Sequence, residues 1–111
     1  MIMNSRKHND VLILLPEGKI TLGDGDQELG EAVRTALANG SRKIVINFSK
    51  VSYLDSSGVG ELVGCYTTAT HRGAKLKLMS LPPKISDVLT VTQLITVFDV
   101  FTNEKDALAS F

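Results

Sequence analysis

The sequence predicts an α/β domain with a mixed, mostly parallel sheet, an antiparallel N-terminal edge and about four helices. Short apolar runs of strand length alternate along the chain with segments whose apolar residues recur at helical spacing. Two strand-like runs also follow each other directly at the N-terminus, which is typical of antiparallel pairing. Alternating strands and helices with right-handed crossovers build a parallel sheet that helices cover.

The first part of the chain predicts three strands. Residues Ile2–His8 form a weak strand candidate, and Asn9-Asp10 separates it from the strongly apolar run Val11–Leu15. Pro16-Glu17-Gly18 is a turn signal, so we expect the chain to turn there before a further strand over Lys19–Leu22.

A helix is predicted after the polar loop that begins at Gly23. Asp26 is the expected N-cap, and Asn39-Gly40 is the expected end. The apolar positions between them recur at helical spacing and define one buried face: Leu29, Ala32, Val33, Ala36 and Leu37.

The run Ile44–Phe48 is apolar at nearly every position, which predicts a central strand covered on both faces. A second helix follows the sequence Asp55-Ser56-Ser57-Gly58 and ends near His71-Arg72-Gly73. Its expected buried face consists of Val59, Leu62, Val63, Tyr66 and Thr70.

The remaining elements are shorter. Lys75–Leu78 alternates between charged and apolar residues and is predicted to be a half-buried strand. Pro82-Pro83 opens a helix, and Val97–Phe101 forms a last short strand or extended segment. Asn103 is the expected cap of a terminal helix. The inward residues of these two helices are Ile85, Val88, Leu89, Ala107 and Leu108.

Length and composition limit the possible functions. The 111 residues fit one domain, residues 1–111, and twelve basic residues balance twelve acidic ones. Because no Lys/Arg cluster appears, we expect neither nucleic acid nor an anionic membrane surface as a ligand. No apolar stretch has the length of a signal peptide or a membrane span, so a cytoplasmic protein is expected. The lone Cys65 is interpreted as a small core residue.

Enzyme chemistry is not supported by the spacing of the candidate residues. Ser57 and His71 lie near opposite ends of one predicted helix, about 20 Å apart, whereas a nucleophile and its base need contact of about 3 Å. Gly58-x-Gly60 lacks the third glycine of a dinucleotide-binding fingerprint, and no phosphate-loop lysine follows. No spacing matches a metal site. We therefore expect no catalytic residue, no metal and no cofactor.

The sequence Asp55-Ser56-Ser57-Gly58 is the most informative feature. It places hydroxyls beside a carboxylate where a strand is followed by a helix, and such residues usually cap the helix for about 1 kcal/mol. One cap suffices, yet three capping residues stand in a row. A phosphate there would add about −1.5 to −2 charges at the helix start. The loop Gly23-Asp24-Gly25 also follows a strand, so it is expected to lie near this corner.

The same residues resemble the signature of STAS domains, specifically bacterial anti-sigma factor antagonists. The resemblance runs through nearly the whole chain. Its strongest part is the segment Val51-x-Tyr53-Leu54-Asp55-Ser56-Ser57-Gly58-Val59-Gly60-Glu61-Leu62, and it also includes Gly18-Lys19-Ile20, Gly73-Ala74-Lys75-Leu76 and Thr92-Gln93-Leu94-x-x-Val97-Phe98.

The resemblance implies a non-enzymatic partner switch. An anti-sigma factor that is itself an ATP-using serine kinase would phosphorylate Ser57, and a PP2C-type phosphatase would reverse the modification. The unmodified protein would bind the kinase and release a sigma factor. The resemblance assigns partner binding to Asp55, Ser56, Ser57 and Gly58.

One departure from the family pattern concerns the loop after Gly18-Lys19-Ile20. Many members carry an aspartate directly after the position of Ile20, where this chain has Thr21. We hypothesise that Asp24 supplies that carboxylate near Ser57, although a loop residue is an equally good interpretation of Asp24.

Two alternative functions stay open at this point. The first is a STAS subunit of another assembly, such as a lipid transporter or a stressosome-like scaffold, without phosphorylation. The second is a ligand- or nucleotide-binding module.

Overall fold

A six-stranded sheet forms the centre of the computed structural model, which describes residues 1–111. The strands are β1 (Ile2–His8), β2 (Val11–Ile20), β3 (Lys43–Asn47), β4 (Val51–Leu54), β5 (Lys75–Met79) and β6 (Val100–Phe101). The helices are α1 (Asp26–Ala38), α2 (Ser56–His71), α3 (Pro83–Val91) and α4 (Glu104–Ala109), and a 3-10 turn covers Leu94–Thr96.

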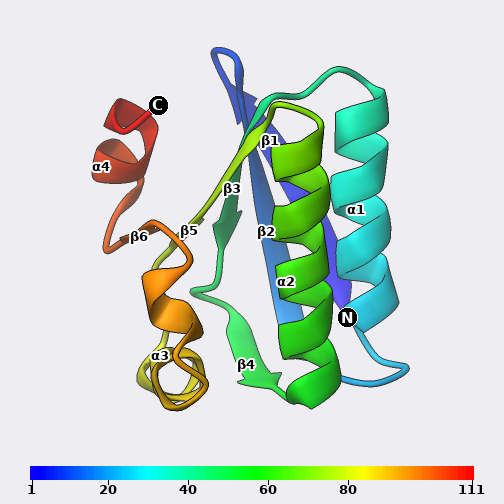
Figure 1. The fold of residues 1–111 in the computed structure, drawn as a ribbon, viewed down its shortest axis with the longest axis vertical. Coiled ribbons are helices and arrows are strands. Elements are labelled where there is room, and N and C mark those ends of the chain that lie inside the picture. The colour runs from blue at the N-terminus through cyan, green and yellow to red at the C-terminus, as the bar shows by residue number, and fades with distance from the viewer.

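The sheet has the order β1-β2-β3-β5-β6, with β4 paired to the end of β2 (Figure 1). Strands β1 and β2 are antiparallel, and all the other pairs are parallel. This confirms the predicted fold class, including the antiparallel edge. Only Val100–Phe101 of the expected last strand pairs with the sheet.

The turn predicted at Pro16-Glu17-Gly18 is wrong. The strand β2 continues through these residues, and Pro16 and Glu17 both pair with β1. The register of the β2–β4 pair shifts between Gly18 and Lys19, and Gly18 has φ of 108°. Strand β2 pairs with β3 before Gly18 and with β4 from Gly18 onward. Gly18 therefore marks an irregularity inside the strand, at the place where its partner strand changes.

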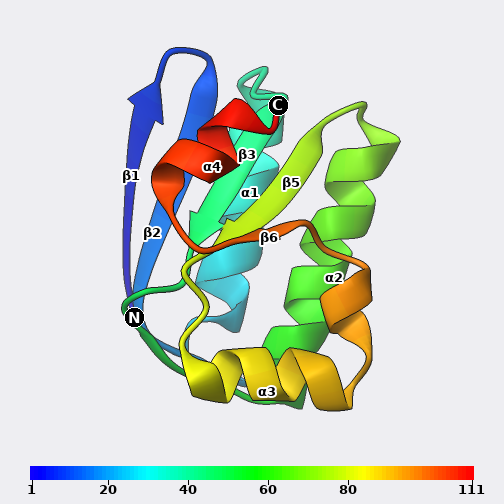
Figure 2. The same ribbon diagram turned by 90° about the vertical axis from the view of Figure 1, so that its left-hand side faces the viewer.

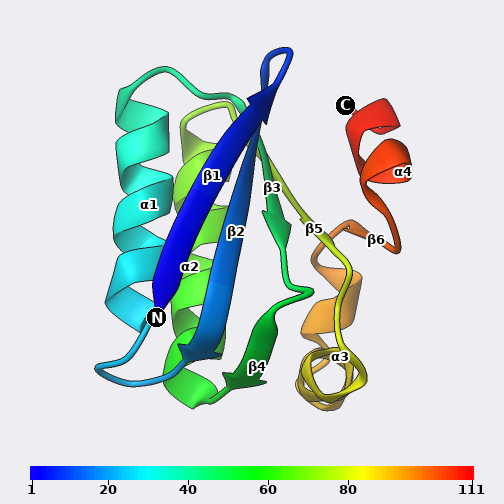
Figure 3. The ribbon, with the colours of Figure 1, turned by 180° about the vertical axis from the view of Figure 1, so that it is seen from behind.

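Helices cover the sheet on both faces. Figure 1 shows α1 and α2 side by side on one face, and Figure 2 shows α4 crossing the opposite face. Figure 3, from behind, shows the hairpin of β1 and β2 at one edge of the sheet and α3 beside β4. The buried centre of β3 confirms the predicted central strand.

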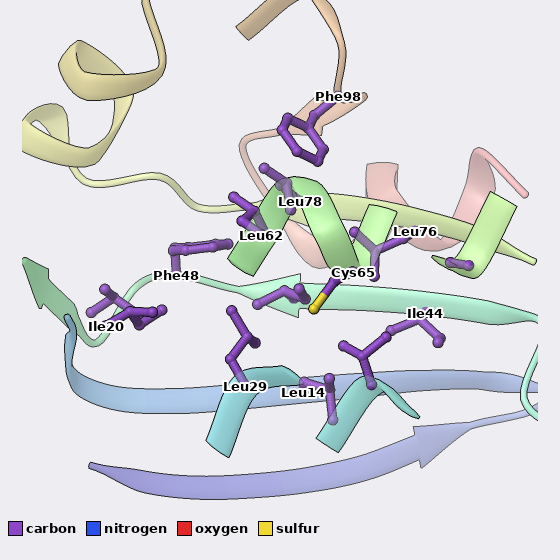
Figure 4. Close-up of a cluster of buried hydrophobic side chains, with 14 of the residues drawn as sticks. Leu14, Ile20, Leu29, Ile44, Phe48, Leu62, Cys65, Leu76, Leu78 and Phe98 are labelled. Atoms are coloured by element: carbon purple, nitrogen blue, oxygen red, sulfur yellow. The ribbon is translucent and has the colours of Figure 1, made fainter. Parts of the chain in front are cut away.

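The larger core cluster lies between the sheet and helices α1 and α2, where Leu29, Leu62 and Phe48 are fully buried (Figure 4). A smaller cluster lies under α4 and consists of Val11, Ile13, Val45, Met79 and Ala107. No helix is both long and apolar enough to cross a membrane.

Several local predictions need correction. The N-cap of α1 is Gly25, with φ of 97°, and Asp26 is instead the first helical residue. Thr70 is exposed, so the buried stripe of α2 runs through Gly58, Leu62, Cys65 and Ala69. Lys77, expected on the solvent side of a half-buried strand, is only 6% exposed.

The two C-terminal helices begin as expected. Pro83 is the first residue of α3, and the Asn103 side chain caps α4 by accepting the backbone N–H of Asp106 at 2.9 Å. Ile85, Leu89 and Ala107 are buried as predicted, whereas Val88 and Leu108 are partly buried.

Candidate functional site

The Asp-Ser-Ser-Gly sequence forms a tight corner at the carboxyl end of the sheet. Strand β4 ends at Leu54 and helix α2 begins at Ser56, so Asp55 alone separates them. Asp55 has an extended backbone, and its Oδ1 accepts the backbone N–H of Gly58 at 2.8 Å. Asp55 is therefore the N-cap of α2, and it satisfies one of the free donors at the helix start.

Asp55 also connects the corner to the loop after β2. Its Oδ2 accepts the backbone N–H of Leu22 at 3.1 Å, and its own N–H donates to the carbonyl of Ile20 at 3.4 Å. The loop that contains Asp24 therefore lies against the corner, which confirms the prediction that these two segments are neighbours. The carboxylate of Asp55 thus accepts hydrogen bonds both from the start of α2 and from the loop after β2.

The same two backbone bonds stabilise the ionised form of the Asp55 carboxyl. The N–H of Gly58, followed by that of Leu22, holds the pKa of the Asp55 carboxyl below its ordinary value. Asp55 is therefore ionised near neutral pH, and a negative charge stands two residues before Ser57.

The side chain of Asp55 caps α2, and the hydroxyls of Ser56 and Ser57 make no hydrogen bond within the chain. Ser56 is exposed and Ser57 is half-buried. Ser57 occupies the second position of α2. The fold leaves both hydroxyl groups free to react or to bind a partner.

Gly58 lets the start of α2 approach the end of β2. A Cβ on Gly58 would collide with the carbonyl oxygen of Ile20 and would lie 2.6 Å from Cδ1 of Leu54. A Cβ on Gly60 would meet no atom within 4 Å. Of these two glycines, Gly58 is the one that the packing requires.

Asp24 lies in a tight turn next to the corner. The backbones of Thr21 and Asp24 exchange two hydrogen bonds of 2.8 and 2.9 Å. The Asp24 carboxylate lies 3.3 Å from the ammonium group of Met1, and its side chain is 56% exposed. It makes no hydrogen bond to Ser57.

Two apolar side chains beside the corner were missed as candidate site residues. Leu22 is 77% exposed and Tyr53 is 52% exposed. Leu22 is bonded through its N–H to Asp55, and Tyr53 precedes Asp55 by two residues. An apolar residue inside a polar loop was a usable signal for Leu22. We call Leu22, Tyr53, Ser56 and Ser57 the corner patch.

The structure does not bring the candidate nucleophile and the candidate base together. Ser57 and His71 lie at opposite ends of α2, and no group of three potential metal ligands is present. Cys65 is buried, and burial raises the pKa of its thiol to about 12. The largest pocket, about 440 Å³, lies between β1 and α1 and includes no residue of the corner patch.

The arrangement defines a class of fold: a mostly parallel sheet with an antiparallel N-terminal edge, two helices side by side on one face, and a hydroxyl-rich corner at the start of the second. The model of the STAS domain family matches residues 3–107. The chain therefore belongs to the STAS domain family.

Individual relatives agree with this assignment. An anti-sigma F factor antagonist from Paenibacillus polymyxa is 24% identical over 91% of this chain and 86% of its own. The crystal structure of a proposed anti-sigma factor antagonist from Thermotoga maritima superimposes with a TM-score of 0.90 at 23% identity, over 97% of this chain and 92% of the other. SpoIIAA from Bacillus, solved in a phosphorylated form, superimposes with a TM-score of 0.74 at 19% identity, over 98% of each chain.

Proposed function

We propose that this STAS domain is an anti-sigma factor antagonist whose partner binding is controlled by phosphorylation of Ser57. The observation that carries the proposal is the free hydroxyl of Ser57 at the start of α2, beside the ionised Asp55 that already caps the helix. Adding a group to Ser57 removes no hydrogen bond from the fold. The modification would therefore change the surface more than the stability of the domain.

The switch acts through charge. In the unmodified state, Asp55, Ser56, Ser57 and Gly58 bind an anti-sigma factor that is also a serine kinase, and this binding releases a sigma factor. Phosphorylation places about −1.5 to −2 charges next to Asp55. An interface that fits a neutral hydroxyl cannot bury this dianion without a large desolvation cost, so the complex dissociates. A PP2C-type phosphatase restores the binding state.

The relatives support this proposal in two ways. The Paenibacillus relative is an anti-sigma F factor antagonist, and its similarity to this chain extends over most of both sequences. The Bacillus neighbour of the same fold exists in a phosphorylated and an unphosphorylated form.

Asp24 has a proposed role in docking the kinase. The bond between Leu22 and Asp55 holds its loop beside the corner, and its carboxylate is mostly accessible. Asp24→Asn should slow phosphorylation of Ser57 and weaken kinase binding. Unchanged values of both quantities would remove this role from Asp24 and leave the Ser57 switch intact.

The central experiment compares proteins captured from cells of the source organism by wild type, Ser57→Ala and Ser57→Asp. We expect wild type and Ser57→Ala to capture a serine kinase, and Ser57→Asp to capture much less of it. Mass spectrometry should find phosphate on Ser57 of the wild type. Ser56→Ala is the matched control, since it removes the neighbouring hydroxyl, and it should keep both capture and phosphorylation.

Equal capture of the same proteins by all variants, together with no phosphate on Ser57, would contradict the switch. That result would favour a STAS subunit of another assembly, in which the corner binds a partner without modification.

A further inference from the structure

Lys77 is a charged residue inside the apolar layer between the sheet and α4. It lies on β5, and its side chain is only 8% exposed. Its neighbour on the same sheet face, Met79, belongs to the smaller core cluster together with Ala107 of α4. An ammonium group is buried in such a layer only where partners replace its water.

The C-terminal segment supplies most of these partners. Nζ of Lys77 donates to the carbonyl oxygen of Ser110 at 3.0 Å and to its Oγ at 2.9 Å. Nζ also lies 4.6 Å from the ring centroid of Phe111, 5.7 Å from that of Phe101 and 3.7 Å from the carboxylate of Asp99. Ser110 is the C-cap of α4, so the cation sits at the end of the helix where carbonyl groups lack partners.

Apart from this contact, α4 is held mainly by Ala107 and by the partly buried Leu108 and Phe111, which pack against the smaller core cluster. The helix has six residues, far fewer than a helix needs to be stable alone, and Ala107 is its only buried residue. At its other end, Glu104 forms an ion pair with Arg6 of β1, but both side chains of that pair are partly exposed. Exposed ion pairs contribute little to stability. Of the two polar contacts, the one that Lys77 makes with Ser110 is therefore the more buried.

We propose that Lys77 is a latch that keeps α4 closed over the second face of the sheet, and that α4 opens locally while the rest of the domain stays folded. Opening uncovers Val11, Ile13, Val45 and Met79. This face lies on the side of the sheet opposite α1 and α2 (Figures 1 and 2).

Hydrogen exchange of the full chain, read by mass spectrometry, tests the latch. Lys77→Met keeps an apolar side chain of similar length in the layer and removes the ammonium group. We expect exchange of the α4 backbone amides to become about ten-fold faster, while exchange in β3 and α2 keeps its wild-type rate or slows. Lys75→Met is the matched control, because Lys75 lies on the same strand and is exposed. It should leave α4 unchanged.

Two results would overturn the proposal. One is unchanged exchange of α4 in Lys77→Met. The other is equal acceleration in α4, β3 and α2, which would show that α4 unfolds only with the whole domain. Ser110→Ala provides a milder variant should Lys77→Met not fold, since it removes one of the two bonds from Lys77 together with the bond that Oγ of Ser110 donates to the Ala107 carbonyl. It should accelerate exchange of α4 alone by about three-fold, and an unchanged rate there would also contradict the latch.

Discussion

Asp55 accepts the backbone N–H of Leu22 at 3.1 Å with one carboxylate oxygen and that of Gly58 at 2.8 Å with the other. The residue is thus both the cap of α2 and the connection between the helix and the loop after β2. Mutation of Asp55 should therefore affect two segments that are distant in sequence.

The first prediction concerns the pH dependence of stability. The folded-state pKa of Asp55 is lowered, so its stabilising contribution is complete above the unfolded pKa of about 4 and is lost as pH falls through the folded pKa. Asp55→Asn keeps a side-chain oxygen that can accept the N–H of Gly58. Its NH2 group, however, replaces the oxygen that accepts the N–H of Leu22. We expect its melting temperature to be lower than that of the wild type at about pH 6, with the difference shrinking toward about pH 3. A difference that grows on acidification would contradict this role of the carboxylate.

The second prediction separates two glycines of one helix. Gly58→Ala should destabilise the domain by about 2–3 kcal/mol, because the added methyl group collides with Ile20 and Leu54. Gly60→Ala should stabilise it by about 0.5–1 kcal/mol, because the added methyl group meets open space and alanine favours a helix. Urea unfolding measures both values. Stabilisation by both substitutions would show that helix propensity, rather than packing, decides at these positions.

The third prediction concerns the thiol of Cys65. Its pKa of about 12 and its burial make the thiolate form scarce near neutral pH. A thiol-reactive chromophore at about pH 8 should label the native protein at least about 100-fold more slowly than the protein unfolded in urea. Rapid labelling of the native protein would mean that the core around Cys65 opens readily.

The fourth prediction tests the corner patch and rests on the proposed function. Leu22→Ser should weaken binding of the captured kinase by about ten-fold, since exposed apolar groups at the centre of an interface contribute strongly to affinity. Stability should change by less than about 0.5 kcal/mol, because Leu22 is 77% exposed. Val97→Ser is the matched control, since it alters another exposed apolar residue, 42% exposed, and it should leave the affinity unchanged. The next residue, Phe98, packs against Tyr66 in the second half of α2. Equal loss in both variants would argue against a specific role for Leu22.

Local sequence patterns determined much of this protein. Alternation and helical spacing depend on residues within a few positions of one another, so they predicted the central strand Ile44–Phe48, the four helices and the antiparallel edge. The corner was found in the same way, because the cap formed by Asp55 for Gly58 spans only three residues. The resemblance to STAS domains rested on those same local residues.

Only the tertiary structure decided the contacts between distant segments. The bond from Leu22 to Asp55 and the bond from Lys77 to Ser110 each join residues 33 positions apart. Alternation in Lys75–Leu78 placed Lys77 on a solvent-facing side, but α4 covers that side and buries the residue. Likewise, Gly18 carried a turn signal, yet pairing with β1, β3 and β4 keeps β2 extended. In each case, packing between distant segments set the environment of the residue, which near neighbours in the sequence do not specify.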